Sequence, residues 1–313
     1  MAYIISVIIP FYNENANINN LINAANIFFV NKEYNAELVF VDDGSSDGSS
    51  DSISQHKFEN YSVKLVKLSK NFGSHIAYRA GVANASGSFV IGLPADLQDP
   101  LTLIDECFEL LKSNDFDIIF AHRRQTNNSW SDTFFSKKYA LLMQKFVSSN
   151  FPENGFDIVM FNNKIKNELN KNIESNSSIF LQILGMGFIQ TSIVYDKKER
   201  KIGKSKWTIS KKIKLLIDSF VAFSYAPIRF VSFVGILFFM FGIIWTVYIA
   251  SRKLIYNDLE TGWPMLTSIL LLGFGITNIG LGIIAEYLWR TLDASRKRPV
   301  FIIDEVIDLK NDK

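Results

Sequence analysis

Two long uncharged stretches constrain the fold of this chain more than any other feature. Residues 230–250 read FVSFVGILFFMFGIIWTVYIA and residues 263–285 read WPMLTSILLLGFGITNIGLGIIA, and neither contains a charged side chain. Each has roughly 20 residues, which is the length of a helix that crosses the hydrocarbon core of a bilayer. Two helices buried in a soluble core are the alternative. Because both stretches are apolar on all faces and flanked by Lys and Arg, we predict a two-helix transmembrane hairpin over residues 230–290.

The charges that flank these stretches predict their orientation. Basic residues cluster before the first stretch and after the second: Lys211, Lys212, Lys214 and Arg229, then Arg290, Arg296, Lys297 and Arg298. In the loop between the stretches, Arg252 and Lys253 are offset by Asp258 and Glu260. By the positive-inside rule both ends of the hairpin are cytoplasmic. We therefore expect a multi-pass protein of the inner membrane, with a large cytoplasmic domain and, over residues 291–313, a cytoplasmic C-terminal tail.

The segment 208–229, just before the hairpin, has an amphipathic pattern. Three lysines lie near its start, and its apolar residues share one helical face: Ile209, Ile213, Leu216, Ile217, Phe220 and Phe223. A basic amphipathic helix of this kind lies in the interface of a lipid bilayer. A helix packed on the preceding domain is the alternative. The adjoining membrane span favours an interfacial helix.

Strands and helices alternate through residues 1–207. Short β-branched runs predict the strands, and the segments are ISVIIP, ELVFVD, VKLVKLS, SFVIGL, FDIIFAHR, FDIVMF and TSIVYDKK. This order predicts an α/β domain whose Rossmann-like, mostly parallel sheet is covered on both faces. The 33 basic and 31 acidic side chains nearly balance, so no nucleic-acid partner is expected. The single cysteine excludes an intrachain disulfide.

Acidic side chains follow two of these predicted strands. Asp42 and Asp43 end one strand, and Asp96 and Asp99 follow another. Ligands of open α/β sheets bind beyond the carboxyl ends of the strands. Neither common glycine-rich phosphate loop is present, and carboxylates hold phosphates only through a divalent cation, although they can bond a ribose or base directly. Ordinary turns, in which such acids bond the local backbone, are the alternative.

A series of short motifs gives these acids a context. The segments PFYNE, VDDGSSDGS, NFG, ADLQDP, GFD, RKIGKSKW and AEYLWRTLDASRKRP occur in this order. Over nearly its whole length the chain resembles the polyprenyl-phosphate glycosyltransferases of glycosyltransferase family 2, which include dolichol-phosphate mannose synthase and bacterial enzymes that charge undecaprenyl phosphate. The resemblance implies a GT-A nucleotide-sugar domain. It also implies inverting transfer of a sugar from a nucleotide donor, expected to be a UDP-sugar, to a polyprenyl phosphate.

The resemblance also assigns the donor side of the site. It implies a nucleoside pocket lined by five residues: Pro10, Tyr12, Glu14, Asp42 and Asp43. The family motif DADLQ holds Mg²⁺ or Mn²⁺, but here Pro94 replaces its first aspartate, leaving Asp96 and Gln98 as the expected metal ligands. Asp99 is a possible substitute ligand. A degenerate, metal-independent or inactive site is the alternative.

For the acceptor side, the resemblance points to basic residues. It assigns Arg200, Ser205 and Lys206 to the lipid phosphate, and Arg123 to the donor diphosphate. It also places the carboxylate of Asp157 near the acceptor, as a catalytic group. Since a phosphate monoester is already mostly a dianion at neutral pH, we expect Asp157 to orient a substrate rather than remove a proton. Basic residues that meet lipid headgroups, and an acid in a plain turn, are the alternatives.

Two other functions remain open at this point. One is a glycosyltransferase with a protein or glycan acceptor, and the other is a catalytically impaired membrane scaffold of the same fold. The resemblance further implies a homo-oligomer, often a tetramer among relatives, although no residue pattern points to it.

Overall fold

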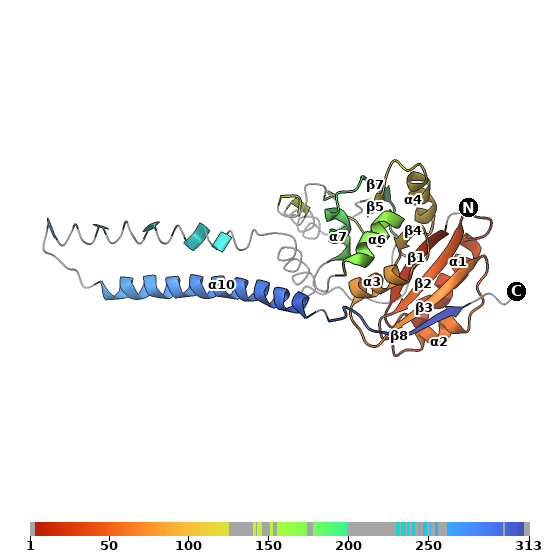
Figure 1. Ribbon diagram of the computed structural model, residues 1–313, viewed down its shortest axis with the longest axis horizontal. Helices are drawn as coiled ribbons and strands as arrows, with labels where there is room; N and C mark the ends of the chain where they lie inside the picture. The colour runs from red at the N-terminus through yellow and green to blue at the C-terminus, as the bar shows by residue number, and fades with distance from the viewer. Residues whose placement is uncertain are drawn as a thin grey trace. The chain divides into compact units, whose positions relative to one another are not determined.

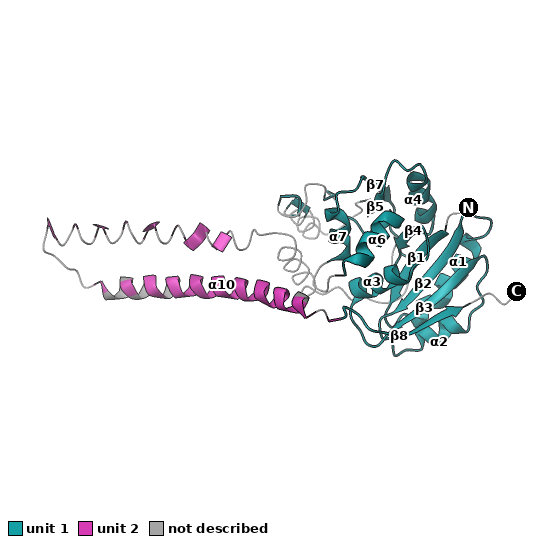
Figure 2. Ribbon diagram, in the orientation of Figure 1, with its two compact units in different colours: residues 1–213, 299–313 teal, residues 214–298 magenta. Residues whose placement is uncertain are grey.

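The computed structural model describes residues 4–124, 155–173, 178–198, 262–296 and 298–309, together with scattered positions between 140 and 152 and between 230 and 255. The chain divides into two compact units (Figure 2). Unit 1 comprises residues 1–213 and 299–313, and unit 2 comprises residues 214–298.

A mixed eight-stranded sheet forms the centre of unit 1 (Figure 1). Its order is β7-β5-β6-β4-β1-β2-β3-β8, and the strands are β1 (Ile4–Phe11), β2 (Asn35–Asp42), β3 (Tyr61–Leu68), β4 (Phe89–Gly92), β5 (Ile118–Arg123), β6 (Ile158–Asn162), β7 (Gln190–Tyr195) and β8 (Ile303–Leu309). The predicted parallel core is confirmed in β3-β2-β1-β4. The sheet is mixed but mostly parallel, as predicted: β5 and β7 run in the same direction as these four strands, whereas β6 runs antiparallel to β4 and β5, and β8 runs antiparallel to β3.

Helices cover both faces of this sheet, as the alternation of elements predicts. One layer contains α1 (Asn15–Phe28), α2 (Ser49–Ser54) and α4 (Thr102–Lys112), whose apolar side chains join the main hydrophobic cluster. The other contains α3 (Ser74–Asn84), α6 (Asn163–Lys171) and α7 (Ile179–Gly185). In α3 a Cβ at Gly81 would lie 2.2 Å from Ile8 Cγ2, so glycine permits the close approach of this helix to β1.

The last strand, β8, lies at the edge of the sheet beside β3. An ion pair between Lys67 and Glu305, with the Nζ and Oε2 atoms 3.0 Å apart, spans the two strands, and the Ser69 amide donates to the carbonyl of Ile302. The sequence analysis predicts no strand here and treats residues 291–313 as a tail. Ile303, Ile307 and Leu309 are half-buried while the other residues of β8 are exposed, as expected of an edge strand.

Unit 2 contains the 33-residue helix α10 (Trp263–Ser295). A Cβ at Gly280 would lie 3.0 Å from Val231 Cγ1, so this helix packs closely on the segment around Val231. Within the described residues, no helix meets the length and apolarity that a membrane span requires. The predicted interfacial helix over residues 208–229 and much of the first predicted span lie outside those residues.

Candidate active site

The topology brings most of the predicted site residues to one edge of the sheet. The parallel strands β2, β4, β5 and β7 have their carboxyl ends at this edge, where Asp42 ends β2 and Arg123 ends β5. Asp157 immediately precedes β6, and the antiparallel direction of β6 brings its amino end to the same edge. Strand β1 lies between β2 and β4, so those two strands are about 10 Å apart across the sheet.

Asp42 and Asp43 are both buried, and the carboxylate of each accepts hydrogen bonds from backbone amides. The Oδ1 atom of Asp42 accepts from the Ser45 amide at 2.7 Å, and its Oδ2 accepts from the Ser50 hydroxyl. Asp43 accepts from the amides of Phe72 and Gly73 at 2.7 and 2.9 Å, which ties the NFG segment before α3 to the end of β2. Asp42 therefore has the turn-building role that was the alternative expectation, whereas Asp43 bonds a loop that is distant in the chain.

Burial raises the pKa of Asp43 above its ordinary value, and the nearby charge of Asp42 adds to this effect. The amides of Phe72 and Gly73 act in the opposite direction, because they bond the charged form. The turn continues through Gly44, whose φ of +74° and close approach to the Lys70 backbone exclude a side chain.

The segment that follows β1 is bonded to this turn. Pro10 pairs with Val41 in the register of β1 and β2, and the carbonyl of Phe11 accepts from the Asp43 amide at 2.9 Å. Tyr12 is 37% exposed, and the Glu14 amide donates to the Ser49 hydroxyl at 3.1 Å. The five residues predicted for the nucleoside pocket thus lie at the carboxyl ends of β1 and β2 or on the adjoining loops that follow them.

The turn after β4 carries the predicted metal ligands. Asp96 and Gln98 are half-buried. The backbone N–H of Gln98 donates to Asp96 Oδ1 at 3.3 Å. Among the residues that the structure describes, no three His, Cys, Asp or Glu side chains gather where they could hold a metal ion. One carboxylate and one amide oxygen fit a hard divalent cation only if phosphate or water oxygens complete its coordination shell. Pro94, at the start of the turn, is exposed.

Asp99 has partners that the sequence analysis does not predict. Its Oδ1 atom accepts a hydrogen bond from the Tyr195 hydroxyl at 2.5 Å and lies 3.3 Å from Lys197 Nζ. The Tyr195 hydroxyl also lies 3.4 Å from Asp157 Oδ2, and Asp157 Oδ2 is 3.8 Å from Arg123 Nε. These contacts join Asp157 and Arg123 to the loop after β4. They also give Asp99 a bonding role that competes with metal ligation.

Burial has the largest effect on the ionisation of this cluster. It raises the pKa of Asp99, and the charge of Asp157 raises it further, while Lys197 and the Tyr195 hydroxyl oppose the shift. Burial also raises the pKa of Tyr195, and the two neighbouring carboxylates add to this effect. The Tyr195 hydroxyl therefore keeps its proton at neutral pH and acts as a hydrogen-bond donor.

Hydrogen bonds to backbone carbonyls join the segment after β7 to the turn after β4, which carries Asp96 and Gln98. The Lys198 amide donates to the Gln98 carbonyl at 2.9 Å, and Gln98 Nε2 donates to the Lys198 carbonyl at 3.4 Å. The predicted acceptor-phosphate residues Arg200, Ser205 and Lys206 follow Lys198 in the chain and lie outside the described residues.

Tyr195 and Lys197 are the site residues that sequence reasoning misses. Both lie in the polar second half of the predicted strand TSIVYDKK. Asp42 and Arg123 likewise lie where predicted strands end. That position is a usable signal, but nothing in the sequence pairs it with Asp99, which lies 96 residues earlier.

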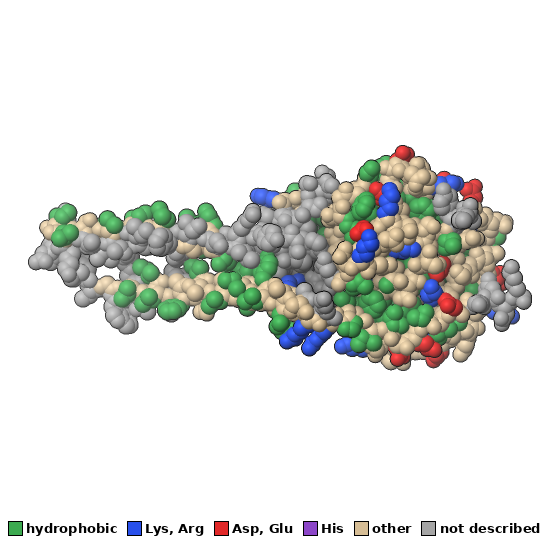
Figure 3. Space-filling model, in the orientation of Figure 1, with side chains coloured by type: hydrophobic (Ala, Val, Ile, Leu, Met, Phe, Trp, Pro, Cys, Tyr) green, Lys and Arg blue, Asp and Glu red, His purple; other side chains and the backbone are tan. Residues whose placement is uncertain are grey.

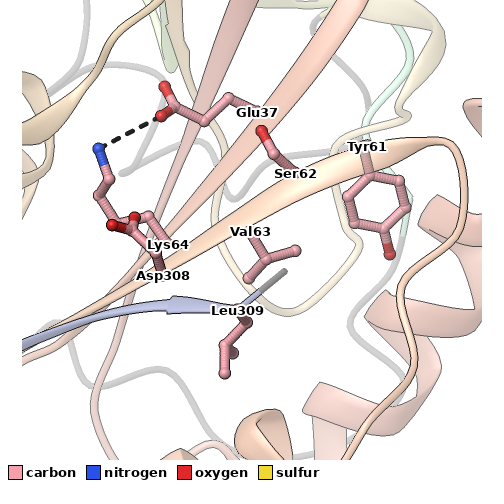
Figure 4. A pocket seen from close by; sticks show the side chains of 7 residues that line it. All are labelled: Glu37, Tyr61, Ser62, Val63, Lys64, Asp308 and Leu309. Atoms are coloured by element: carbon pink, nitrogen blue, oxygen red, sulfur yellow. Dashed lines mark ion pairs between the residues drawn. The ribbon is translucent and has the colours of Figure 1, made fainter. Parts of the chain in front are cut away.

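A hollow of about 420 Å³ lies elsewhere, on the β3 and β8 side of the sheet (Figure 4). Its lining residues are Glu37, Tyr61, Ser62, Val63, Lys64, Asp308 and Leu309. Glu37 and Lys64 form an ion pair with a 3.4 Å separation, and the Glu37 carboxylate also accepts from the Ser6 hydroxyl and the Ser86 amide. These bonds join the amino-terminal halves of β1 and β2 to the loop before β4, so the pair has a structural role.

Comparison with known proteins agrees with this geometry. The model of the family "Glycosyl transferase family 2" matches residues 6–196, which include the whole described cluster except Lys197 and Lys198. The chain belongs to glycosyl transferase family 2. It is a glycosyltransferase, and the match extends along the mixed α/β sheet from β1 to β7.

Curated relatives match the chain almost from end to end. A protein named uncharacterized glycosyltransferase YkcC, from Bacillus subtilis, is 31% identical over 98% of this chain and 95% of its own length. The undecaprenyl-phosphate 4-deoxy-4-formamido-L-arabinose transferase of Proteus mirabilis is 29% identical over 98% and 94%. The prophage bactoprenol glucosyl transferase homolog of Escherichia coli K12 is 29% identical over 96% and 99%.

Proposed function

We propose that this glycosyltransferase transfers a sugar, with inversion, from a UDP-sugar to polyprenyl phosphate at the cytoplasmic face of the inner membrane. The named relatives from Proteus mirabilis and Escherichia coli support the lipid acceptor, because their names specify undecaprenyl phosphate and bactoprenol and they align over nearly the whole chain. The product would serve cell-envelope glycan synthesis or lipid modification.

One observation carries the proposal: the turn at residues 96–99 is bonded to the segment 195–198 through both backbone and side chains. The first segment carries the predicted cation ligands of the donor side. The second leads directly into the stretch ERKIGKSKW, which contains Arg200, Ser205 and Lys206. This connection supports a single site in which a donor diphosphate and an acceptor phosphate lie side by side.

On the donor side, the loops that contain Tyr12, Glu14, Asp42 and Asp43 would hold the nucleoside. Asp96 and Gln98 would bind Mg²⁺ or Mn²⁺ together with oxygens of the donor diphosphate. A cation bound there supplies charge stabilisation to the leaving diphosphate. The half-exposed guanidinium of Arg123 is suited to assist, because arginine matches phosphate oxygens with several fixed donors.

On the acceptor side, the reaction would be a single in-line displacement. A phosphate oxygen of the lipid attacks the anomeric carbon, the new C–O bond forms, and the bond from that carbon to the donor diphosphate breaks. The dianionic phosphate needs no deprotonation, so Asp157 would orient the acceptor or a sugar hydroxyl. Arg200, Ser205 and Lys206 would hold the lipid phosphate against the repulsion of the diphosphate.

The membrane location is supported by the two uncharged stretches and by the surface of α10. Several large apolar side chains of this helix are between 44% and 66% exposed: Leu266, Leu270, Phe274, Ile279, Leu281, Ile284, Leu288, Trp289 and Leu292. Figure 3 shows such apolar groups distributed along the described part of unit 2. A continuous exposed apolar surface on a helix marks contact with lipid or with another protein. We propose contact with the bilayer, and a homo-oligomer in which copies of the hairpin adjoin.

The experiment that tests this function is direct. Purified full-length protein is incubated with radiolabelled UDP-sugars, Mg²⁺ or Mn²⁺, and undecaprenyl phosphate in detergent or vesicles, and the label in the organic phase is measured. Label that depends on both the lipid and the cation supports the proposal. Transfer only to a protein or glycan would favour the non-lipid acceptor. No transfer and no nucleotide binding would favour a scaffold.

A further inference from the structure

The hydroxyl of Tyr195 lies between two carboxylates at the site. It donates to Asp99 Oδ1 at 2.5 Å and lies 3.4 Å from Asp157 Oδ2. Tyr195 ends β7, Asp99 lies on the loop after β4, and Asp157 immediately precedes β6. One oxygen atom therefore links three separate elements of the sheet.

The Asp99 end of this arrangement is firmly held. The Asp99 side chain is only 2% exposed, and Lys197 Nζ adds a second contact to the same Oδ1 atom. We call Lys197, Asp99 and Tyr195 the site triad. Because a buried, charge-assisted hydrogen bond is short and directional, the tyrosine ring and hydroxyl have a fixed position relative to the loop that carries Asp96 and Gln98.

The Asp157 end has weaker contacts. The side chain is 29% exposed, and its ion pair with Arg123 has a 3.8 Å separation, with the arginine side chain 50% exposed. An exposed ion pair of that length restrains a carboxylate poorly. The backbone of Asp157 is held by the bond between its amide and the Ala121 carbonyl, and within the described part of the chain its carboxylate also contacts the buried Tyr195.

Under the function proposed above, we propose that Tyr195 is a positioning residue: its hydroxyl, anchored by Asp99 and Lys197, shares its single proton between Asp99 Oδ1 and Asp157 Oδ2 and so fixes the direction in which the Asp157 carboxylate aligns the acceptor. Arg123 is then available to the donor diphosphate, because the shared Tyr195 proton stays beside Asp157 when the arginine turns away, and Lys197 still compensates Asp99. This role deepens the acceptor side of the reaction, and it couples Asp157 to the turn that carries the cation ligands.

A second triad of the same composition provides the matched control. In the remote triad, Lys32 Nζ is 2.6 Å from Asp105 Oδ2 and the Tyr34 hydroxyl donates to Asp105 Oδ1 at 2.7 Å. Tyr34 immediately precedes β2, at the end of that strand opposite Asp42, and no second carboxylate contacts its hydroxyl among the described residues. Tyr34→Phe and Tyr195→Phe therefore delete the same kind of bond in two places.

The test compares wild type, Tyr195→Phe, Tyr34→Phe, Asp157→Asn and the double variant Tyr195→Phe/Asp157→Asn in the lipid-transfer assay. We expect Tyr195→Phe to lower kcat by about 10- to 100-fold, as misplacement of a catalytic group does, with the KM of each substrate within about twofold of wild type. Tyr34→Phe should keep wild-type kcat. In the Asp157→Asn background, Tyr195→Phe should change kcat by less than about twofold, because the group that it positions is already lost. Thermal unfolding shows that each variant is folded.

Three results would overturn this role. They are a kcat of Tyr195→Phe within about twofold of wild type, an equal loss in Tyr34→Phe, and a full further loss in the Asp157→Asn background. Failure of the proposed function is a separate outcome: wild-type protein would then transfer no sugar to lipid, and the positioning role would be rejected with it.

Discussion

The two triads of unit 1 each consist of a lysine, an aspartate and a tyrosine, but they have different roles. In the remote triad, Lys32 and Tyr34 each contact a different oxygen of Asp105, whose side chain is 37% exposed. In the site triad, Lys197 and Tyr195 both contact Oδ1 of Asp99, whose side chain is 2% exposed. The remote triad fastens α4 to the residues before β2, and no second carboxylate contacts its tyrosine hydroxyl among the described residues.

The difference lies in what surrounds the tyrosine. Tyr195 has a second carboxylate, Asp157, within reach of its hydroxyl, and Asp157 in turn contacts Arg123. Hydrogen bonds that join only structural residues stabilise the fold. Hydrogen bonds that also reach a residue at the reaction site can fix the position of that residue. Composition alone does not separate the two cases, and the place of each triad on the sheet does.

The largest expected effect is on sugar transfer, and it distinguishes Asp96, a carboxylate of the site, from Asp105, the carboxylate of the remote triad. Asp96→Ala should lower sugar transfer by at least about 100-fold, because the cation that it would hold supplies several kcal/mol of charge stabilisation. Asp105→Ala should leave transfer unchanged. Both are measured by organic-phase extraction of labelled lipid. Pro94→Asp, which restores the family motif, should retain transfer or lower the cation concentration needed for half-maximal rate. An active Asp96→Ala protein would remove the assigned metal role.

The second prediction compares the stability of the two triads. Asp99→Ala should lower the free energy of unfolding by about 3 kcal/mol, because it leaves Lys197 and the Tyr195 hydroxyl without their buried acceptor. Asp105→Ala should cost about 1 kcal/mol, since that carboxylate is partly exposed. Denaturant unfolding measures both. Equal losses would show that burial does not distinguish the triads.

The third prediction concerns a structural acid away from the site. Burial alone would raise the pKa of Glu37, but hydrogen bonds from Ser6 and Ser86 and the charge of Lys64 hold it below its ordinary value of 4.5. A lowered pKa in the folded state means that Glu37 stabilises the fold at neutral pH, and that this contribution is lost as the pH falls below 4.5 through the folded-state pKa.

Glu37→Gln should therefore lower the free energy of unfolding by about 2 kcal/mol at pH 7. The gap from wild type should narrow at pH 3, and sugar transfer at pH 7 should persist. Urea unfolding at the two pH values measures the gap. A gap that is constant or wider at pH 3 would contradict the sign of the shift.

The smallest expected effect belongs to Lys32. Its ion pair with Asp105 is partly exposed, and its Nζ also lies 3.8 Å from the centre of the Phe28 ring. Lys32→Met should cost less than about 1 kcal/mol, and the cost should shrink further in high salt, because an exposed pair is screened. Transfer should remain at the wild-type level. A larger loss of stability would mean that the remote triad is as important to the fold as the site triad.

Several features of this protein are determined by its sequence alone. The β-branched runs predict β1 to β7, and the acids that follow β2 and β4 indicate the functional edge of the sheet. Family membership also follows from the motifs, and the family match confirms it. These signals are local: a strand, a turn and a motif each depend on residues that are neighbours in the chain.

Only the tertiary structure decided which distant residues meet. Ile303–Leu309 reads as a tail, yet it pairs with β3 because the sheet has an open edge there, more than 200 positions away in the chain. The antiparallel β6 brings Asp157 to the edge where Tyr195 and Asp99 lie. Pairings across the chain depend on strand order and register, and neither is written in the local pattern of any one segment.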